Sequence, residues 1–373
     1  MNGGSFKLTK IFGIDVEINF SWILIFILFS FTLAQQYFPQ MIEDLDSSVY
    51  WSMGIITTLL IFFSVLLHEL AHSLRAIKEG IPIKKITLFI FGGVAQMEKE
   101  PEKAKAELRI ALIGPAMSIA LAFLFWLLYQ FLPPDLPLAQ MIWFLARLNL
   151  IVGTVNLIPA FPLDGGRVLR AALWHFLNNM LRATRFAVLV GSIFAFFAIG
   201  IGFLMIFQYA WIWGLWYIFL GWMLYQAGQA SYNQLIFQQA LKGVLVKEIM
   251  SPNVHTVPPQ LTLNELVEQF FRHKFGAFPV TEDGILKGLV TFHQIREIPR
   301  ERWGYTTVSQ IMVPAEQVKK VSPNDEAVEV MMKMAQENIG RVIVIEKQQI
   351  VGILSRTDMM KLINMHMMLG TEK

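Results

Sequence analysis

Long apolar runs separated by short polar segments dominate the first 230 residues of the chain. The runs cover residues 20–33, 51–77, 108–132, 141–158, 186–207 and 210–228. Such runs are typical of membrane-spanning helices, so the pattern predicts six spans. Residues 5–18 instead alternate apolar and polar positions around a glycine, which predicts a short hairpin lying on the membrane surface.

Beyond residue 229 the pattern changes to that of a soluble α/β domain, and it repeats. Phe275–Val280 aligns with Ile339–Val344, and Leu286–Thr291 aligns with Ile350–Ser355, in each case 64 residues further along the chain. Each unit predicts helix, strand, turn, strand and helix. The expected domains are a membrane domain over 1–230, a linker over 231–245, and repeats over 246–305 and 306–373.

Composition supports a multi-span α-helical membrane protein with about six transmembrane helices and a C-terminal soluble α/β module. Of 373 residues, 55% are hydrophobic and 16% charged, and the mean hydropathy is +0.50. The chain has no cysteine, which excludes disulfides and cysteine metal ligands. A net charge of +3 without a basic, aromatic-rich stripe gives no indication of nucleic-acid binding.

Basic side chains are distributed unevenly between the predicted loops. They gather in the N-terminal segment and in residues 78–109 and 167–185, whereas residues 35–50 and 133–140 contain no Lys or Arg. Because cytoplasmic loops carry the excess of Lys and Arg, we expect a multi-pass protein of the cell membrane with both termini in the cytoplasm.

A carboxylate and two imidazoles lie at the inner end of the second apolar run. His68 and His72 are four positions apart, so a helix presents both rings on one face, which suits two nitrogens on one small cation. Glu69 lies on the adjacent part of the turn, where it can take a proton from a water held by the metal. The pattern H-E-x-x-H also occurs by chance on solvated helices, but an unpartnered cluster is costly in lipid. We therefore predict a metal site.

Two histidines leave an open zinc site in need of a third protein ligand. Without cysteine, the candidates are His175, which we expect at the membrane interface, and the carboxylates of the membrane domain. Asp164 is the strongest, because it follows Pro159 and Pro162 and precedes two glycines, the pattern of a broken helix that lines a polar cavity. Alternatively, Asp164 caps a helix at the interface.

The two motifs together, His68-Glu69-x-x-His72 and Asn156-x-x-Pro159-x-x-x-x-Asp164-Gly165, resemble the site-2 protease family of intramembrane zinc metalloproteases. The resemblance covers about residues 5–230. It implies that His68, His72 and Asp164 hold one Zn²⁺ per chain. It also implies that Glu69 is the general base and that Asn156 hydrogen-bonds near the reacting water or carbonyl oxygen.

Two further segments match features of this family. A strand follows the second span in the family, and residues 87–95 fit it, so that an extended substrate can add to an edge at Gly92, Gly93 and Val94. As an isolated segment, these residues equally suit a structural hairpin. Residues 114–118, Gly-Pro-Ala-Met-Ser, match a small-residue pattern of the family that we interpret as helix packing alone.

The C-terminal repeats resemble the CBS (cystathionine-β-synthase) motif, which pairs in tandem, from Val246 to about Met365. In CBS pairs that bind adenine nucleotides, a Ser or Thr followed three residues later by Asp contacts ribose and phosphate. The second repeat has this pattern at Ser355, Thr357 and Asp358, whereas the first has Gln294 in place of the acid. The resemblance implies at most one ATP or AMP site and a homodimer formed through the module. Alternatively, Asp358 caps the following helix.

The chain is therefore expected to be an intramembrane zinc metalloprotease that hydrolyses peptide bonds in or near transmembrane segments and is regulated by its CBS pair. Its expected partners are the lipid bilayer and transmembrane substrates such as membrane-anchored regulators or signal-peptide remnants. A substrate helix must first unwind, because its carbonyls are hydrogen-bonded within the helix. A CBS-gated metal or ion transporter is the main alternative, and an inactive scaffold is a second one.

Overall fold

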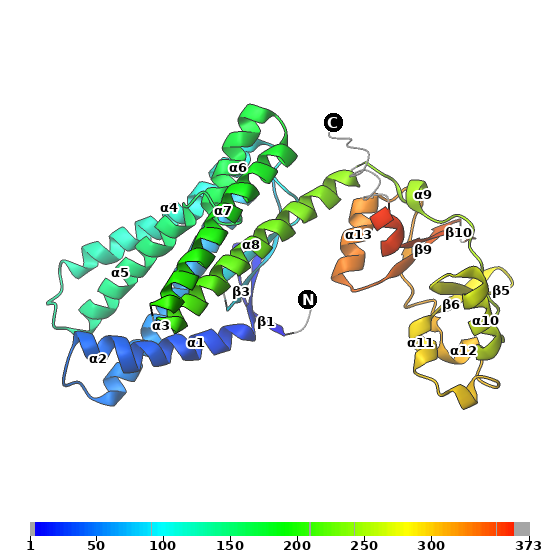
Figure 1. Ribbon diagram of the computed structural model, residues 1–373, viewed down its shortest axis with the longest axis horizontal. Coiled ribbons are helices and arrows are strands. Elements are labelled where there is room, and N and C mark those ends of the chain that lie inside the picture. The colour runs from blue at the N-terminus through cyan, green and yellow to red at the C-terminus, as the bar shows by residue number, and fades with distance from the viewer. Residues whose placement is uncertain (1–3, 91, 209, 242, 348, 362–373) are drawn as a thin grey trace. The chain divides into compact units, whose positions relative to one another are not determined.

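The computed structural model describes residues 4–361 except 91, 209, 242 and 348 (Figure 1). The chain forms two compact units that divide between Gln234 and Leu235. This division falls within α8 (Trp211–Ala240), so the first part of the segment predicted as a linker is helical.

The first unit is built mainly of helices. They are α1 (Ser21–Thr32), which continues through a π-helical turn η1 (Leu33–Tyr37) into α2 (Phe38–Met41), α3 (Ser47–Lys78), α4 (Ala104–Tyr129), α5 (Pro137–Asn156), α6 (Asp164–Leu177), α7 (Met180–Phe207) and α8. Their ends follow local chemistry: α5 begins at Pro137, a residue suited to the first helical position, and α3 ends before Gly80, which has a φ of 82°.

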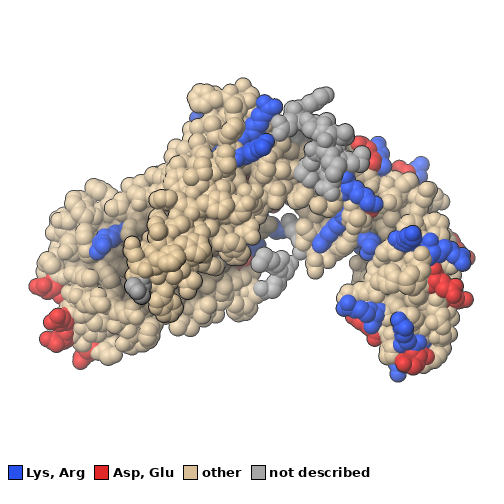
Figure 2. All heavy atoms as spheres, in the orientation of Figure 1, with Lys and Arg blue, Asp and Glu red and all other residues tan. Residues whose placement is uncertain are grey.

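Among the described residues, five helices are long and apolar enough to cross a membrane. These are Ser21–Met41, α3, α4, α5 and α7. The sixth predicted span lies in the first part of α8, which is rich in Trp and Tyr, residues typical of membrane interfaces. A crossing by α8 therefore stays a prediction. Figure 2 shows few charged side chains on the visible face of this unit and many of both signs on the second unit.

A four-stranded sheet packs against the inner end of α3. Its strands are β1 (Ser5–Ile11), β2 (Ile14–Asn19), β3 (Ile83–Phe89) and β4 (Gly92–Met97), in that order. The predicted hairpin over residues 5–18 is present as β1 and β2, and residues 87–95 fall in the second hairpin, β3 and β4. Val16 and Ile86 of the sheet pack against Leu66 and Leu70 of α3. In the strand order β4 is an edge of the sheet, and it lies near the His-Glu motif, with Gly93 against Glu69.

The second unit contains the two predicted repeats. The first has α9 (Val246–Ile249), α10 (Leu263–His273), β5 (Ala277–Glu282), β6 (Ile285–Thr291), α11 (Phe292–Arg296) and a 3₁₀ turn η2 (Arg300–Arg302). The second has α12 (Val308–Ile311), β7 (Val313–Pro314), β8 (Lys320–Val321), α13 (Ala327–Gln336), β9 (Arg341–Glu346) and β10 (Gln349–Ser355). The strands form the sheets β5-β6-β7 and β10-β9-β8. The helix-strand-strand order expected for each repeat is confirmed.

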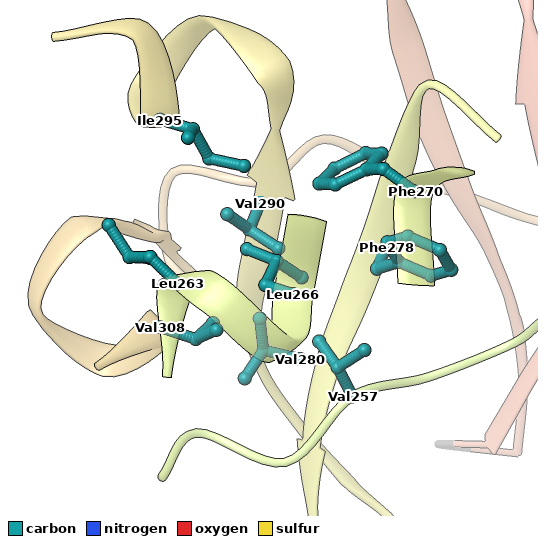
Figure 3. Close-up of a cluster of buried hydrophobic side chains, with 9 residues drawn as sticks. All are labelled: Val257, Leu263, Leu266, Phe270, Phe278, Val280, Val290, Ile295 and Val308. Carbon is teal, nitrogen blue, oxygen red and sulfur yellow. The ribbon is translucent and has the colours of Figure 1, made fainter. Parts of the chain in front are cut away.

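Each repeat has its own hydrophobic core. Figure 3 shows nine buried side chains that point toward one another, eight from the first repeat and Val308 from the start of the second. On α10 the core positions Leu263, Leu266 and Phe270 recur at helical spacing, so the helix lays one apolar face on the sheet. The ring of Phe270 meets that of Phe278 edge-on at 4.8 Å between centroids.

Candidate metal centre

Two imidazoles and one carboxylate converge between α3 and α6. His68 Nε2 lies 3.2 Å from His72 Nε2, and Asp164 Oδ2 lies 3.2 Å from the former and 3.0 Å from the latter. Neighbouring ligands of a tetrahedral zinc ion lie about 3.3 Å apart, so the donor set fits this metal in both chemistry and spacing. All three side chains are buried. Within the described parts of the chain, no other group of three or more His, Asp or Glu donors lies as close together.

The position of Asp164 depends on a close approach of α6 to the preceding loop. A Cβ at Gly165 would overlap the carbonyl oxygens of Leu157 and Ile158, and a Cβ at Gly166 would overlap the backbone of Phe161. The two glycines therefore let α6 begin directly beside the loop. The alternative role of Asp164 as a cap is not what the geometry shows, because α6 has Leu163 at its N-cap and the carboxylate bonds to the imidazoles.

A positively charged side chain lies beside Asp164. Arg167 Nη1 adds a positive charge 3.7 Å from Asp164 Oδ1. This charge favours the ionised carboxylate that a metal ligand needs.

Helix α4 sets the orientation of both rings. His72 Nδ1 donates to the carbonyl oxygen of Ile110 at 2.6 Å, and His68 Nδ1 lies 2.9 Å from Ser118 Oγ. Because a carbonyl can only accept, the proton of neutral His72 resides on Nδ1, which leaves the Nε2 lone pair directed at the other donors.

Residues 114–118 do more than the helix packing expected from the sequence. A Cβ at Gly114 would overlap His72 Nε2 and lie 2.7 Å from His68 Nε2, and Ser118 bonds to His68. The packing interpretation is therefore wrong in excluding a contact with the site. The sequence contains a signal for this contact, because Gly114 and Ser118 are four residues apart and therefore share one face of the helix. That face offers close approach at the glycine and a hydrogen-bonding hydroxyl at the serine.

A cavity of about 590 Å³ opens onto the three donors. Glu69 and Asn156, both predicted from the sequence, line it together with Gly92–Ala95 of β4. A Cβ at Gly93 would lie 3.2 Å from Glu69 Cδ, so the acid lies against the edge strand. The cavity also has a polar wall that sequence reasoning missed, at Asn149, whose Nδ2 donates to Ser64 Oγ at 3.3 Å and to the Leu145 carbonyl at 2.9 Å.

A second cavity, of about 360 Å³, lies between the two repeats of the C-terminal unit. Ser355, Thr357 and Asp358 line it with Lys274 and Arg341. Asp358 Oδ2 accepts from Ser355 N at 3.0 Å and from Ser355 Oγ at 2.6 Å, while Asp358 N donates back to Ser355 Oγ. Ser355 is thus the residue that caps the helical residues 356–361, and Asp358, three positions later, closes a capping box with it; the alternative in which Asp358 itself caps a helix from Met359 onward is wrong. His175, the other candidate ligand, is not part of the donor cluster.

Comparisons with known proteins agree with this division. Peptidase family M50 matches residues 56–140 and 134–199, and the CBS domain matches residues 246–301 and 308–364. The chain is 32% identical to Rip3 of Mycobacterium tuberculosis over 96% of the chain and 93% of that protein. It is also 32% identical to zinc metalloprotease MJ0392 of Methanocaldococcus jannaschii, over 96% of the chain and 95% of that protein. The solved site-2 protease of Methanocaldococcus jannaschii matches 61% of the chain and 94% of its own length at 32% identity, with a TM-score of 0.42.

The substitution Gly114→Ala tests the contact between α4 and the two rings. We expect the zinc content of the purified protein to fall at least tenfold, because the added methyl group occupies space between the donor nitrogens. Gly200→Ala in α7 is the matched control, since a Cβ there meets nothing within 4 Å. Equal zinc content in both variants, measured by mass spectrometry of the metal, would contradict the expectation.

Proposed function

The chain belongs to peptidase family M50, the site-2 protease type of intramembrane zinc metalloprotease, and from this premise we propose that His68, His72 and Asp164 hold its zinc. The observation that carries the proposal is the approach of three donors to within 3.2 Å of one another beside a cavity that Glu69 also lines. Family membership also favours the protease over the transporter and the inactive scaffold.

The proposed reaction is hydrolysis of a peptide bond in or near a transmembrane segment. When bound, zinc polarises the peptide carbonyl and lowers the pKa of water towards about 7. Glu69 takes the proton of the attacking water and then gives it to the leaving amine. Asn156 donates a hydrogen bond from its carboxamide to the carbonyl oxygen, a role supported by its place in the cavity wall at the end of α5.

The substrate is proposed to bind as an extended segment along β4. Three features support this: β4 is an edge of its sheet, Gly92 and Gly93 carry no side chains that would hinder approach, and Gly93 lies against Glu69. Main-chain hydrogen bonds to this edge would hold the segment in the unwound form that hydrolysis requires. The bond to be cut would then lie next to the general base.

The arrangement in the membrane is proposed from the distribution of charge. Basic residues in the N-terminal segment and in residues 78–109 and 167–185 favour the cytoplasmic side for these segments and for both termini. The site then lies at membrane depth near the cytoplasmic face, where it meets transmembrane substrates such as membrane-anchored regulators or signal-peptide remnants.

The CBS pair is proposed to bind one adenine nucleotide and to regulate cleavage. The cavity between the repeats supports this, because Lys274 and Arg341 offer positive charge for phosphate and Asp358 offers a carboxylate for ribose. In the first repeat Gln294 stands at the position of Asp358 and accepts from the Thr291 backbone at 2.9 Å. Pairing of two chains through the module is part of the same proposal.

The substitution Glu69→Gln tests the general base. We expect cleavage to fall by about 10²–10⁴-fold while zinc stays bound, since the amide cannot take a proton and is not one of the three donors. Substrates are first identified as membrane proteins that co-purify with the variant from its native membrane, and their cleavage by each form is then followed by mass spectrometry.

Glu79→Gln is the control, because Glu79 follows the last residue of the same helix and pairs with Arg75 and Arg109. It should cleave like the unaltered protein. Undiminished turnover in the Glu69→Gln form would exclude the proposed role.

Calorimetry of the full chain in detergent with ATP and with AMP tests the nucleotide site. We expect one site per chain and a Kd at least tenfold weaker for Asp358→Asn, which keeps an oxygen for the cap but loses the charge. Gln294→Ala in the first repeat should bind as the unaltered chain does. If neither nucleotide gives a heat signal, the module does not bind nucleotide and its remaining expected role is dimerisation. If Asp358→Asn binds as tightly as the unaltered chain, the nucleotide binds at a site that does not include Asp358.

A further inference from the structure

A buried ion pair joins the first turn of α4 to the second turn of α6. Arg170 donates to Glu107 Oε1 from Nε at 2.6 Å and also from Nη2. Glu107 is fully buried and Arg170 is 5% exposed. The guanidinium also lies 5.0 Å from the centre of the Phe161 ring, in the loop that leads into α6. No part of the proposed reaction uses either charge.

The pair lies on the same face of α4 as the contacts to the zinc-binding rings. Glu107 is followed by Ile110, whose carbonyl accepts from His72, by Gly114, which packs against both rings, and by Ser118, which bonds to His68. These positions recur every three or four residues and so form one stripe along the helix. The histidines of α3 and the helix that carries Asp164 are thus both attached to one face of α4, between Glu107 and Ser118.

The pair is poorly explained as a source of stability. Transfer of two charges out of water costs several kcal/mol per ion, and buried pairs can often be replaced by apolar residues without loss of stability. Here the compensation is incomplete, since Glu107 Oε2 is buried without a hydrogen-bond partner among the residues that the structure describes. The pair does fix the orientation of Arg170 relative to Glu107, because two N–H groups of a planar guanidinium meet one carboxylate oxygen.

The position of α6 matters because of where Asp164 stands. Asp164 is the first residue of α6 and Arg170 lies six residues later, so rotation or sliding of the helix moves the carboxylate directly. Metal–ligand distances tolerate only about 0.2 Å of variation. Gly165 and Gly166 set the distance between α6 and the loop before it. They do not fix the position of α6 and its loop relative to α4, so a separate contact with α4 is needed.

We propose that Glu107 and Arg170 are positioning residues of the metal centre: their ion pair fixes the position of α6 relative to α4 and so keeps the carboxylate of Asp164 beside the two imidazoles. The proposal rests on the proposed zinc site. Neither residue touches the reacting atoms, and both act through Asp164.

The test uses two variants of the full chain in detergent, with the metal alone as probe. Glu107→Leu combined with Arg170→Met removes both charges, and Arg170→Lys keeps the charge but replaces the planar fork with a single ammonium. Zinc affinity is measured by competition with a chelator, the ligand geometry from the visible spectrum of the Co²⁺-loaded protein, and folding from the thermal unfolding midpoint of the metal-free protein.

The apolar variant should unfold at the same temperature as the unaltered chain or higher, bind zinc about 10- to 100-fold more weakly, and show an altered Co²⁺ spectrum. Arg170→Lys should have a zinc affinity between those of the apolar variant and the unaltered chain. The matched control is Glu17→Leu combined with Lys85→Met, which removes the 2.7 Å ion pair between β2 and β3 and should leave affinity and spectrum unchanged.

Unchanged zinc affinity and spectrum in the folded apolar variant would overturn the positioning role. If that variant does not fold, Arg170→Lys decides by the same two measurements, and unchanged values again overturn the role. An unaltered chain that takes up no zinc would overturn the proposed metal site and this inference together, so the two failures are distinguishable.

Discussion

Polar groups at membrane depth must find their partners within the protein, and this constraint shapes the whole membrane unit. Lipid offers no hydrogen bonds, so each imidazole needs a hydrogen-bond partner for Nδ1 and a second polar group or a metal ion for Nε2. Ile110 and Ser118 on α4 supply the first, and Asp164 on α6 lies opposite the second. A site of this kind therefore cannot be formed by the motif-bearing helix α3 alone.

Close approach of backbones makes this arrangement possible. Gly114 lets α4 lie against the two rings, Gly165 and Gly166 let α6 start beside its loop, and Gly93 lets the edge strand reach Glu69. In each case a methyl group would meet another group at less than contact distance. The glycines are therefore as necessary to the geometry as the donors themselves, although they take no part in the chemistry.

The donors were predictable from the sequence because each belongs to a local pattern. His68 and His72 share a helical face, and Asp164 stands in a broken-helix segment, so their types and spacing were enough to select them. Asn149, Glu107 and Arg170 were not selected, because their partners lie 63 to 85 residues away and no local period links them. In the C-terminal unit the internal repeat predicted the two helix-strand-strand units, but the place of Asp358 inside its helix, with Ser355 as the cap, could be seen only in three dimensions.

The proposed site requires that one metal ion is held by two imidazoles and one carboxylate from two separate helices. X-ray absorption at the zinc edge of the purified protein tests it most directly. We expect nitrogen and oxygen ligands at about 2.0–2.1 Å with the outer scattering of two imidazoles, and a changed ligand shell in Asp164→Ala. Zinc with the same spectrum in the Asp164→Ala variant, or zinc without imidazole scattering, would contradict it.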